Sequence, residues 1–470
     1  MKQTGIMILL TLITLFLHAQ ENVPGKLAAE WKSFCNDAQL KYALAGICVL
    51  DAQTGKVLFE KNSNTGMAPA STQKVITAIA SFEAFGPAYQ YTTEVGYTGK
   101  IASGKLTGDL VITGHGDPTL ASPRYTATNE NQLLANICAA VKKAGIDTIT
   151  GNIVGTDNSF DLNPVPGGWI WADMGNYYGA GHWAINWNEN QYDLLVKTGS
   201  RENEPIEVTG TNPALVGTAN FVNEVKTGKP GTGDMSIIYA DPFSVTSLYQ
   251  GTLEPNKNKV SGSIPNADLF ALQTIRQYLQ SQKIFIKSQP INNLQRYANQ
   301  QLKPSGITPV YTHHSPTLDS LVYWFLKKSI NLYGEAFVRT IGMEKKGNGS
   351  VEKGLEWVDS LYAANGVDSK AMRLSDGCGL SPANRITPLV ITKALQFAKG
   401  RSWFSYFYDA LPLYNNMKLK SGTIAGVKSF AGYHTSKTGK QYIVSFIVNN
   451  YNGSPSALVN KMFTVLNALK

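Results

Sequence analysis

The feature that most constrains the fold of this chain is that strand-like segments lie at both of its ends. Near the N-terminus, two short apolar runs separated by a tight turn predict a β-hairpin, and near the C-terminus three more such runs precede a helical segment. The predicted strands are residues 43–50, 56–60, 418–424, 429–435 and 442–449. One antiparallel sheet flanked by helices accommodates all of them, which predicts an α+β fold whose sheet is built from both chain ends.

The long middle of the chain must then be an insertion into this domain. Between about residue 97 and residue 302 the sequence changes to short β-like runs rich in Gly, Asn and Thr. Insertions at exposed loops are well tolerated, because the two parts of the interrupted domain can stay together. We therefore expect a discontinuous domain, made of residues 24–96 and 303–470, that is interrupted by one or two β-rich domains in residues 97–302.

The N-terminal residues predict export. Lys2 is followed by an apolar run from Ile6 to Leu17 and then by a short polar segment, which is typical of a secretory signal peptide over residues 1–20. The run is short for a transmembrane helix, and no second long apolar stretch follows it in the sequence. We expect a periplasmic or cell-envelope protein without a stable membrane span after signal cleavage. Tethering through an uncleaved signal is the alternative.

Charge and cysteine content exclude several classes of function. The excess of lysine and arginine over acidic residues gives a formal net charge of +9. These basic residues are scattered along the chain, so no nucleic-acid partner is expected. The cysteines are too few and too widely spaced for a disulfide framework, although their pairing or free state stays open. They are Cys35, Cys48, Cys138 and Cys378. No Cys-x-x-Cys or His-x-x-x-His spacing predicts a metal site, and no motif predicts a cofactor.

A serine and a lysine three residues apart are the first candidates for catalysis. Ser71 and Lys74 begin a predicted helix over residues 71–85, so both side chains project from one face near its N-terminus. A buried lysine can take the proton of a serine hydroxyl, and N–H groups at the helix N-terminus can stabilise an oxyanion. The same spacing recurs at Ser350 and Lys353, where a serine that caps a helix is the better interpretation.

A second motif, Ser329-Ile-Asn331, lies at the end of a helical run that begins at residue 318. The Ser329 hydroxyl could relay a proton between Lys74 and a leaving group. The Asn331 amide could hold both Lys74 and a substrate carbonyl. A helix–loop junction that satisfies its own backbone is the alternative for this common tripeptide.

The third motif is Lys420-Ser421-Gly422-Thr423, at the start of a C-terminal strand. Its cation and two hydroxyls could hold the C-terminal carboxylate of a peptide that lies along the strand, and Gly422 would let the peptide backbone approach closely. The spelling Lys-Thr-Gly also occurs at Lys197, Lys226 and Lys437. Only Lys420 starts a strand that is followed by the predicted meander.

Taken in this order, the three motifs resemble those of the penicillin-binding proteins and serine β-lactamases. The finer resemblance is to the class C low-molecular-mass penicillin-binding proteins, which are D-alanyl-D-alanine carboxypeptidases and endopeptidases, and it covers nearly all of the mature chain. Other segments that carry it are residues 108–120, 169–180, 329–342, 376–381 and 420–433.

This resemblance implies a fold and a role for each motif residue. The main domain would be a penicillin-recognising serine transpeptidase-like domain, and the insertion would contain a nested subdomain at about residues 190–255. Ser71 would be the acylated nucleophile and Lys74 its base, with Ser329 and Asn331 completing the proton relay. Residues 420–423 would bind the substrate carboxylate, and the N–H groups of Ser71 and Thr423 would form the oxyanion hole.

The aromatic segment departs from the family pattern. It usually reads Trp-x-Trp-Asp-Asp, and here Ala172 replaces the first acid. In relatives this region recognises the amine-bearing side chain of the peptide, so Trp169, Asp173 and Tyr177 are candidate substrate-binding residues, and Asp173 could substitute for the missing acid. A plain hydrophobic cluster is the alternative for the aromatic residues. Cys378 also departs from the pattern, since relatives usually have Ser there.

These features together predict a D-alanyl-D-alanine carboxypeptidase that acts on peptidoglycan stem peptides through a Ser71 acyl-enzyme and is covalently inhibited by β-lactams. Endopeptidase action on the same peptides stays open. The alternatives are a serine β-lactamase, which would need a device for rapid deacylation, and a non-catalytic protein that binds β-lactams or peptidoglycan. A Ser-His-Asp hydrolase is not expected, because the sequence has no Gly-x-Ser-x-Gly elbow.

Overall fold

The computed structural model describes residues 22–157, 159–215 and 219–470. The predicted signal peptide lies outside the described residues. None of the helices in these ranges combines the length and the apolar composition that a membrane crossing would require. All four cysteines fall within them and are free thiols, of which Cys35 is exposed and the others are buried.

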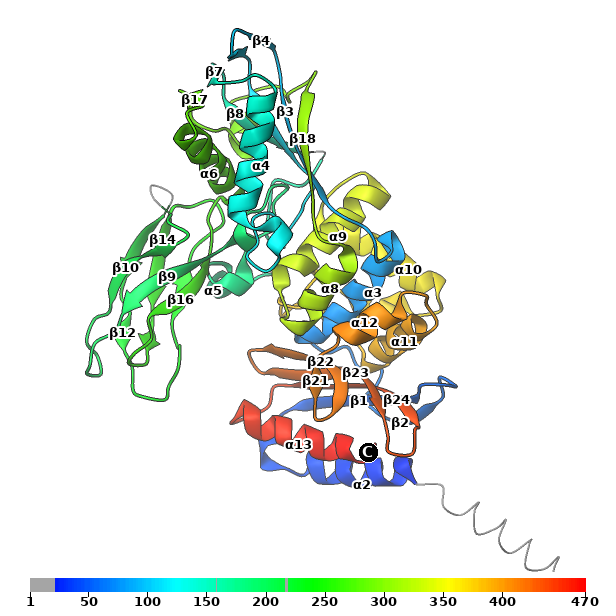
Figure 1. Cartoon of the computed structure of the whole chain (residues 1–470). Coiled ribbons are helices and arrows are strands. Elements are labelled where there is room, and N and C mark those ends of the chain that lie inside the picture. The colour runs from blue at the N-terminus through cyan, green and yellow to red at the C-terminus, as the bar shows by residue number, and fades with distance from the viewer. Residues whose placement is uncertain (1–21, 158, 216–218) are drawn as a thin grey trace, which may run out of the picture.

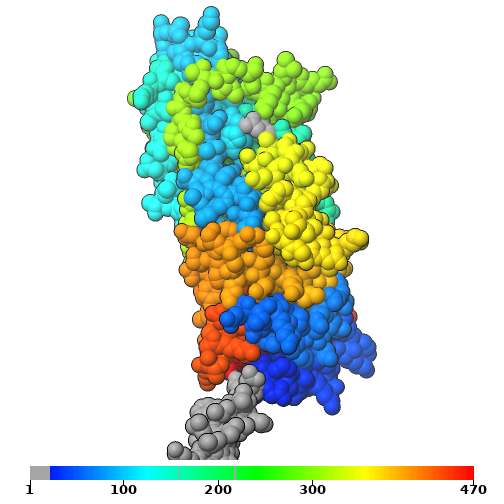
Figure 2. Space-filling model, turned by 90° about the vertical axis from the view of Figure 1, so that its right-hand side faces the viewer, coloured from blue at the N-terminus to red at the C-terminus, as the bar shows by residue number. Residues whose placement is uncertain are grey.

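A six-stranded antiparallel sheet joins the two ends of the chain, as predicted. Its order is β2 (Val57–Lys61), β1 (Leu44–Asp51), β24 (Gln441–Asn449), β23 (Val427–Thr435), β22 (Met417–Ile424) and β21 (Leu413–Tyr414). Along the β1–β24 pair, Leu44 lies opposite Asn449 and Asp51 opposite Tyr442. Figure 2 shows the N-terminal residues, in blue, directly beside C-terminal residues in orange. The short edge strand β21 is an addition to the predicted set.

The two central strands are apolar on both faces because helices cover both faces (Figure 1). Alternate residues of β24 point into two different cores: Val444 and Phe446 pack under α2 (Val23–Cys35) and α13 (Pro455–Asn467), whereas Ile443 and Ile447 face the opposite layer. That layer contains α3 (Lys74–Phe85), α8 (Leu318–Lys327), α9 (Asn331–Lys346), α10 (Val351–Ala364), α11 (Pro388–Lys399) and α12 (Phe404–Ala410). A short hairpin of β19 (Met372–Arg373) and β20 (Arg385–Ile386) lies in the same part of the chain.

The second serine–lysine pair has the structural role that the sequence predicts. Ser350 is the N-cap of α10, and its hydroxyl accepts a hydrogen bond from the backbone N–H of Lys353 at 3.2 Å. The Lys353 amine is turned to the exposed residue Glu356, at 2.8 Å. This pair therefore caps the N-terminus of a helix and has no catalytic arrangement.

The inserted segment has its own hydrophobic core, built around two helices and two four-stranded sheets (Figure 1). The helices are α4 (Glu130–Lys143) and α6 (Ala267–Ser281), and a shorter one, α7 (Asn293–Ala298), follows them. One sheet has the order β18 (Thr308–His314), β3 (Thr92–Tyr97), β6 (Leu110–Gly114) and β8 (Ile153–Asp157). The other has the order β17 (Phe285–Ile286), β7 (Thr148–Ile149), β5 (Lys105–Thr107) and β4 (Lys100–Ala102).

Three smaller sheets form a separate lobe of the insertion. Their strands are β9 (Gln191–Lys197), β10 (Glu207–Asn212), β11 (Asn220–Asn223), β12 (Lys226–Thr227), β13 (Ile237–Tyr239), β14 (Thr246–Gln250), β15 (Thr252–Leu253) and β16 (Lys259–Ser263). Because β16 pairs with β9, this lobe extends past residue 255, the expected end of the nested subdomain. The chain leaves the main domain through β3 and re-enters it through β18, and these two strands pair with each other. β3 crosses the expected limit at residue 97, and β18 lies beyond the expected limit at residue 302. These domain limits stay predictions.

The packing of α2 on the sheet gives a prediction for stability. Phe446 is fully buried, with ring centroids 5.6 Å from Trp31 and 5.2 Å from Phe34 of α2. Phe446→Ala should lower the free energy of unfolding by about 3–5 kcal/mol, because it leaves a cavity between the sheet and its covering helix. Urea unfolding measures this change. The matched control is Phe285→Ala, whose ring is 64% exposed, and which should change stability by about 0.5 kcal/mol or less. Equal effects of the two substitutions would contradict the packing described.

Candidate active site

Ser71 lies in a 3₁₀ turn, η2 (Ala70–Gln73), and the α-helix begins only at Lys74. The predicted helix over residues 71–85 is therefore tighter at its start than expected. Ala70 has a left-handed backbone with φ of 49°, and the Thr72 hydroxyl donates to the carbonyl of Pro69 at 2.7 Å. These two features hold the turn, which presents Ser71 to a cavity.

Lys74 is fully buried and makes contact with the other predicted catalytic residues. Its Nζ donates to Ser71 Oγ at 3.0 Å, to Asn331 Oδ1 at 2.6 Å and to the carbonyl oxygen of Cys378 at 2.6 Å. Burial lowers the pKa of the Lys74 amine from its usual 10.5, although the charges expected at Cys378, Asp376 and Glu335 oppose this. A neutral amine in this position can accept the Ser71 proton while it still donates to the other two partners.

Asn331 is the first residue of α9, and Ser329 lies in the short connection from the end of α8, in agreement with its predicted place after the helical run from residue 318. The Asn331 side chain is fixed at both ends, because its Oδ1 accepts from Lys74 and its Nδ2 donates to the carbonyl of Tyr178 at 2.8 Å. Ser329 has a left-handed backbone with φ of 57° and lines the cavity beside Ser71. Among the described residues, no hydrogen bond joins the Ser329 hydroxyl to Ser71 or Lys74, so its place in a proton relay stays a prediction.

The third motif is on β22, but its residues are not equally accessible. Thr423 lines the cavity with Ser71, and its hydroxyl accepts from Lys428 at 2.7 Å. Lys420 is buried, and its amine donates to the carbonyl of Ser421 at 2.8 Å. Burial, aided by the nearby charge of Lys74, holds the pKa of Lys420 well below its usual range. The Ser421 hydroxyl donates to Tyr414 at 3.1 Å.

Gly422 has a structural requirement in addition to its predicted role beside the substrate, which stays a prediction. A Cβ atom at this position would lie 2.3 Å from Ser429 Oγ, 2.7 Å from the carbonyl oxygen of Pro69 and 2.9 Å from the backbone nitrogen of Ser71. The close approach is thus made by the nucleophile turn itself. The glycine lets β22 lie directly against that turn, which brings Thr423 and Ser71 to the same cavity.

The edge of β22 beside the cavity is open in the described structure. β21 pairs only with Met417 and Lys418, whereas β23 pairs with β22 as far as Ile424. Within the described residues, no strand pairs with the remainder of this outer edge, from Lys420 to Ile424. An extended peptide can bind there by backbone hydrogen bonds.

The aromatic segment divides into a buried and an exposed part. Trp169 is 7% exposed and its indole N–H donates to Asp376 at 3.0 Å. It is not among the residues that line the cavity, so the hydrophobic cluster describes it better than a substrate contact. Asp173, on the short helix α5 (Trp171–Met174), and the half-exposed Tyr177 both line the cavity. Burial raises the pKa of Asp173, and a hydrogen bond with Tyr178 opposes this.

Two buried acids near Lys74 were not predicted as site residues. Asp376 accepts hydrogen bonds on both oxygens, including ones from Trp169, Gln73 and the backbone N–H of Gly379. Glu335 accepts from the backbone N–H of Gly377 at 2.9 Å, and burial raises its pKa to about 8. The sequence contained one signal for each acid. Asp376 begins a glycine-rich stretch, and Glu335 stands among mostly apolar residues.

These acids and Cys378 bring three potential metal ligands within 4.8 Å of one another. Both oxygens of Asp376 already accept N–H groups, from Cys378 and Gly379 on Oδ1 and from Ser381 on Oδ2. This donor set fits a turn that is held by its own hydrogen bonds rather than a metal centre. We therefore assign Asp376 to the support of the residue 376–379 turn, which carries the carbonyl that binds Lys74.

Ser71, Ser329, Asn331 and Thr423 line one cavity of about 870 Å³. Its walls come from η2, the start of α9, the end of β22 and the inserted segment. The lining residues are Ser71, Arg124, Ile170, Asp173, Tyr177, Tyr178, Gln191, Lys328, Ser329, Ile330, Asn331, Leu380, Pro382, Thr423, Ile424, Ala425, Gly426, Tyr451 and Pro455. The volume is large enough for several residues of a peptide.

Comparison with known proteins identifies relatives of nearly the same extent. The D-alanyl-D-alanine carboxypeptidase of Actinomadura sp. is 26% identical over 450 residues, which cover 90% of this chain and 80% of the relative. D-alanyl-D-alanine carboxypeptidase DacB of Haemophilus influenzae is 24% identical over 428 residues, or 87% and 85% of the two chains.

A solved structure shows the same fold. The crystal structure of penicillin binding protein 4 from Haemophilus influenzae matches with a TM-score of 0.79 at 22% identity, over 93% of this chain and 98% of that one. A second structure of that protein, complexed with a β-lactam, matches with a TM-score of 0.73 at 20% identity, over 94% and 98% of the chains. The fold implied by the motif resemblance is thereby confirmed.

The family comparison agrees with both findings. The model of the D-Ala-D-Ala carboxypeptidase 3 (S13) family matches residues 27–415, which include the Ser71–Lys74 and Ser329–Asn331 motifs and the whole insertion but end just before Lys420. With a family match over most of the chain, relatives of similar length and a shared fold, this serine-type hydrolase belongs to the D-Ala-D-Ala carboxypeptidase 3 (S13) family.

Proposed function

We propose that this protein removes the terminal D-alanine from peptidoglycan stem peptides through an acyl-enzyme on Ser71. The observation that carries the proposal is the arrangement around the buried Lys74 amine, which lies 3.0 Å from Ser71 Oγ and 2.6 Å from Asn331 Oδ1. An amine with a lowered pKa beside a serine hydroxyl is a general base that needs no histidine. Membership of a carboxypeptidase family supports the same reaction.

The reaction follows from this arrangement in two halves. Neutral Lys74 takes the Ser71 proton as Oγ attacks the carbonyl carbon of the penultimate D-alanine, and the N–H groups of Ser71 and Thr423 stabilise the oxyanion. The proton on Lys74 then passes to the leaving amine, with Ser329 as the relay, and the C–N bond breaks. In the second half a water molecule gives a proton to Lys74 and attacks the ester carbonyl. The ester C–O bond then breaks, Lys74 returns the proton to Ser71 Oγ, and the shortened peptide leaves.

The open edge of β22 supports the proposed binding mode. The peptide would add as a strand beside residues 420–424, with its terminal carboxylate near the hydroxyls of Ser421 and Thr423. Lys420 donates to a backbone carbonyl and is buried, so it would act on the carboxylate through its field more than through direct contact. The remainder of the peptide would extend toward Asp173 and Tyr177.

The proposed substrate also predicts where the protein acts and what inhibits it. Peptidoglycan lies outside the cytoplasmic membrane, so residues 1–20 would direct export to the periplasm or the cell envelope. A β-lactam carries a strained amide in place of the D-alanyl-D-alanine bond and would acylate Ser71 in the same way. The relative that was crystallised with a β-lactam supports this expectation.

Covalent labelling with a fluorescent penicillin tests the nucleophile. The wild-type protein should be labelled to about one equivalent, and Ser71→Ala should not be labelled, because it removes the hydroxyl that lies 3.0 Å from the buried Lys74 amine. The chain supplies a matched control in Ser350→Ala, which has the same spacing to a lysine but only caps α10. This control should label like wild type. Equal labelling of Ser71→Ala and wild type would refute the assignment.

The pH dependence of acylation tests the base. Only the neutral form of Lys74 accepts a proton, so the second-order rate constant for penicillin acylation should rise with pH and level off, with a midpoint below 10.5 because burial lowers the Lys74 pKa. Lys74→Arg keeps the charge but stays protonated, so it should lower the rate constant by about 10²- to 10⁴-fold. Lys353→Arg is the control and should leave the rate constant unchanged. A rate constant independent of pH would exclude Lys74 as the base.

Product analysis separates the proposed reaction from the β-lactamase alternative. Incubation with a stem pentapeptide that ends in D-Ala-D-Ala should release one equivalent of free D-alanine and leave the peptide shortened by one residue, as detected by mass spectrometry. The penicilloyl adduct on Ser71 should persist over the same period, because within the described residues Lys74 is the only side chain that makes a hydrogen bond with Ser71 Oγ. Rapid turnover of penicillin without release of D-alanine would instead support a β-lactamase.

A further inference from the structure

Arg124 presents a cation to the cavity wall and has no part in the reaction described above. It lies in the loop between β6 and α4, its side chain is 26% exposed, and it lines the same cavity as Ser71. Its guanidinium is 5.4 Å from the ring of Trp324 on α8. The inserted segment therefore places a positive charge beside α8, at the wall of the cavity.

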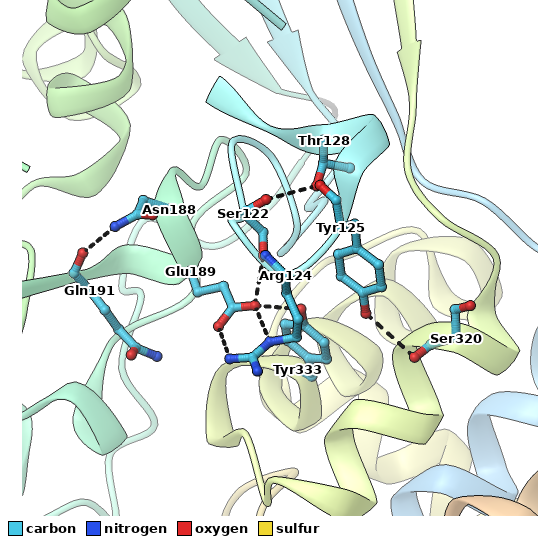
Figure 3. A network of polar contacts seen from close by, with 9 residues as sticks. All are labelled: Ser122, Arg124, Tyr125, Thr128, Asn188, Glu189, Gln191, Ser320 and Tyr333. Carbon is cyan, nitrogen blue, oxygen red and sulfur yellow. Dashed lines mark hydrogen bonds and ion pairs between the residues drawn. The ribbon is translucent and has the colours of Figure 1, made fainter. Parts of the chain in front are cut away.

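Glu189 holds the Arg124 guanidinium in one orientation (Figure 3). Arg124 Nε and Nη2 each donate to a Glu189 carboxylate oxygen at 2.8 Å. The carboxylate also accepts the hydroxyls of Ser122 and Tyr333, both at 2.8 Å, and its side chain is only 5% exposed. Four donors satisfy this buried anion, whereas the third guanidinium nitrogen, Nη1, makes no hydrogen bond within the described residues.

The backbone is distorted to place Glu189. The 3₁₀ turn η5 (Asn188–Asn190) has three successive left-handed residues, with φ of 53°, 54° and 52°. Asparagine tolerates this conformation, but glutamate does so less readily. Side-chain bonds compensate, since Asn188 Nδ2 donates to the carbonyl of Gln191 and Asn190 Nδ2 to that of Gly181, both at 2.8 Å. Strain of this kind persists where the surroundings over-determine it, often at ligand sites.

The charges along the cavity favour an anionic ligand group near Arg124. Lys328 is a second cation among the lining residues, and Asp173 is the only carboxylate among them. The hydrogen bonds from Arg124 to Glu189 raise the pKa of the guanidinium further above its usual value, so it stays charged at every relevant pH. A guanidinium whose Nη1 amino group is free of hydrogen bonds within the described residues, held by a satisfied carboxylate, is arranged to bind an oxygen anion.

We propose that Arg124 binds a carboxylate of the peptide substrate other than the terminal one held at β22. The inference rests on the proposed function, because it takes the ligand to be a peptide that ends at the scissile D-alanine or continues beyond it. The carboxylate could belong to the residue before the D-alanyl unit or to the residue beyond the scissile bond. Glu189, Ser122 and Tyr333 are positioning residues that act through Arg124.

The test uses binding to a Ser71→Ala background, so that it does not depend on turnover. Two peptide pairs distinguish the sources of the carboxylate. The first pair has Glu or Gln directly before D-Ala-D-Ala, and the second ends in D-Ala-D-Glu or D-Ala-D-Gln after a neutral residue. Dissociation constants are measured by NMR titration. The readout is the ratio of the constants within each pair, which a general loss of stability would not change.

In this background, the carboxylate peptide of at least one pair should bind about tenfold or more tightly than the matching amide peptide. The reason is that the amide loses a charge-assisted hydrogen bond. The double variant Arg124→Gln with Glu189→Gln should bring that ratio to about one without leaving a buried carboxylate unpaired. Arg124→Lys keeps the charge but lacks the fork, and should give an intermediate ratio. The pair that responds identifies the position of the carboxylate.

The control is a second arginine–glutamate pair of the insertion. Arg201 and Glu204 make a 2.8 Å ion pair, but Arg201 is 85% exposed and neither residue lines the cavity. Changing both to Gln should preserve the ratio. A carboxylate preference that survives in the Arg124–Glu189 double variant, or no preference in either pair, would overturn the inference. Failure of the proposed function is a separate result, because it would appear as wild-type protein that neither reacts with penicillin nor releases D-alanine.

Discussion

The burial of the Lys74 amine is the constraint on which the rest of the site depends. An amine out of water needs partners for its hydrogens, and here three oxygen atoms supply them from the nucleophile turn, from α9 and from the turn at residues 376–379. The first of these elements precedes the insertion in sequence and the other two follow it. The pairing of β1 with β24 fixes the two parts of the domain together. The sheet is therefore what makes a buried, partnered lysine possible.

Asp376 and Glu335 oppose a neutral Lys74 amine, since negative charge raises the pKa of an amine. Asp376 accepts N–H groups on both oxygens, so much of its charge is already compensated. Burial raises the pKa of Glu335 to about 8, so this carboxyl group is mostly protonated at neutral pH. The pocket can thus hold a polar, hydrogen-bonded turn under Lys74 without fixing a proton on the amine. Burial therefore leaves Glu335 polar and hydrogen-bonded but mostly uncharged.

The sequence predicts the sheet, its two-ended topology and the pairing of Ser71 with Lys74, because strand periodicity and motif spacing are local signals. The addition of Asn331 to this pair rests on the family resemblance of the three motifs. What the sequence misses depends on contacts between residues far apart. Trp169 turns inward because Asp376, some 200 positions later, accepts its indole N–H. Gly422 is required by the nucleophile turn, whose distance from β22 no local pattern encodes. Secondary structure follows from periodicity, whereas the orientation of a side chain is decided by its partners.

The insertion takes part in the site rather than only enclosing it. The Asn331 amide has two ends of similar size, and which one faces Lys74 decides whether the amine meets an acceptor or a donor. The carbonyl of Tyr178 accepts the Nδ2 group at 2.8 Å, which leaves Oδ1 for Lys74. Tyr178 also lines the cavity and adjoins Asp173 and Tyr177, the residues at which a peptide side chain would lie. One backbone carbonyl of the insertion therefore connects the orientation of the base to the wall that selects the substrate, and a ligand that moves this wall would also change the hydrogen bonding of Lys74.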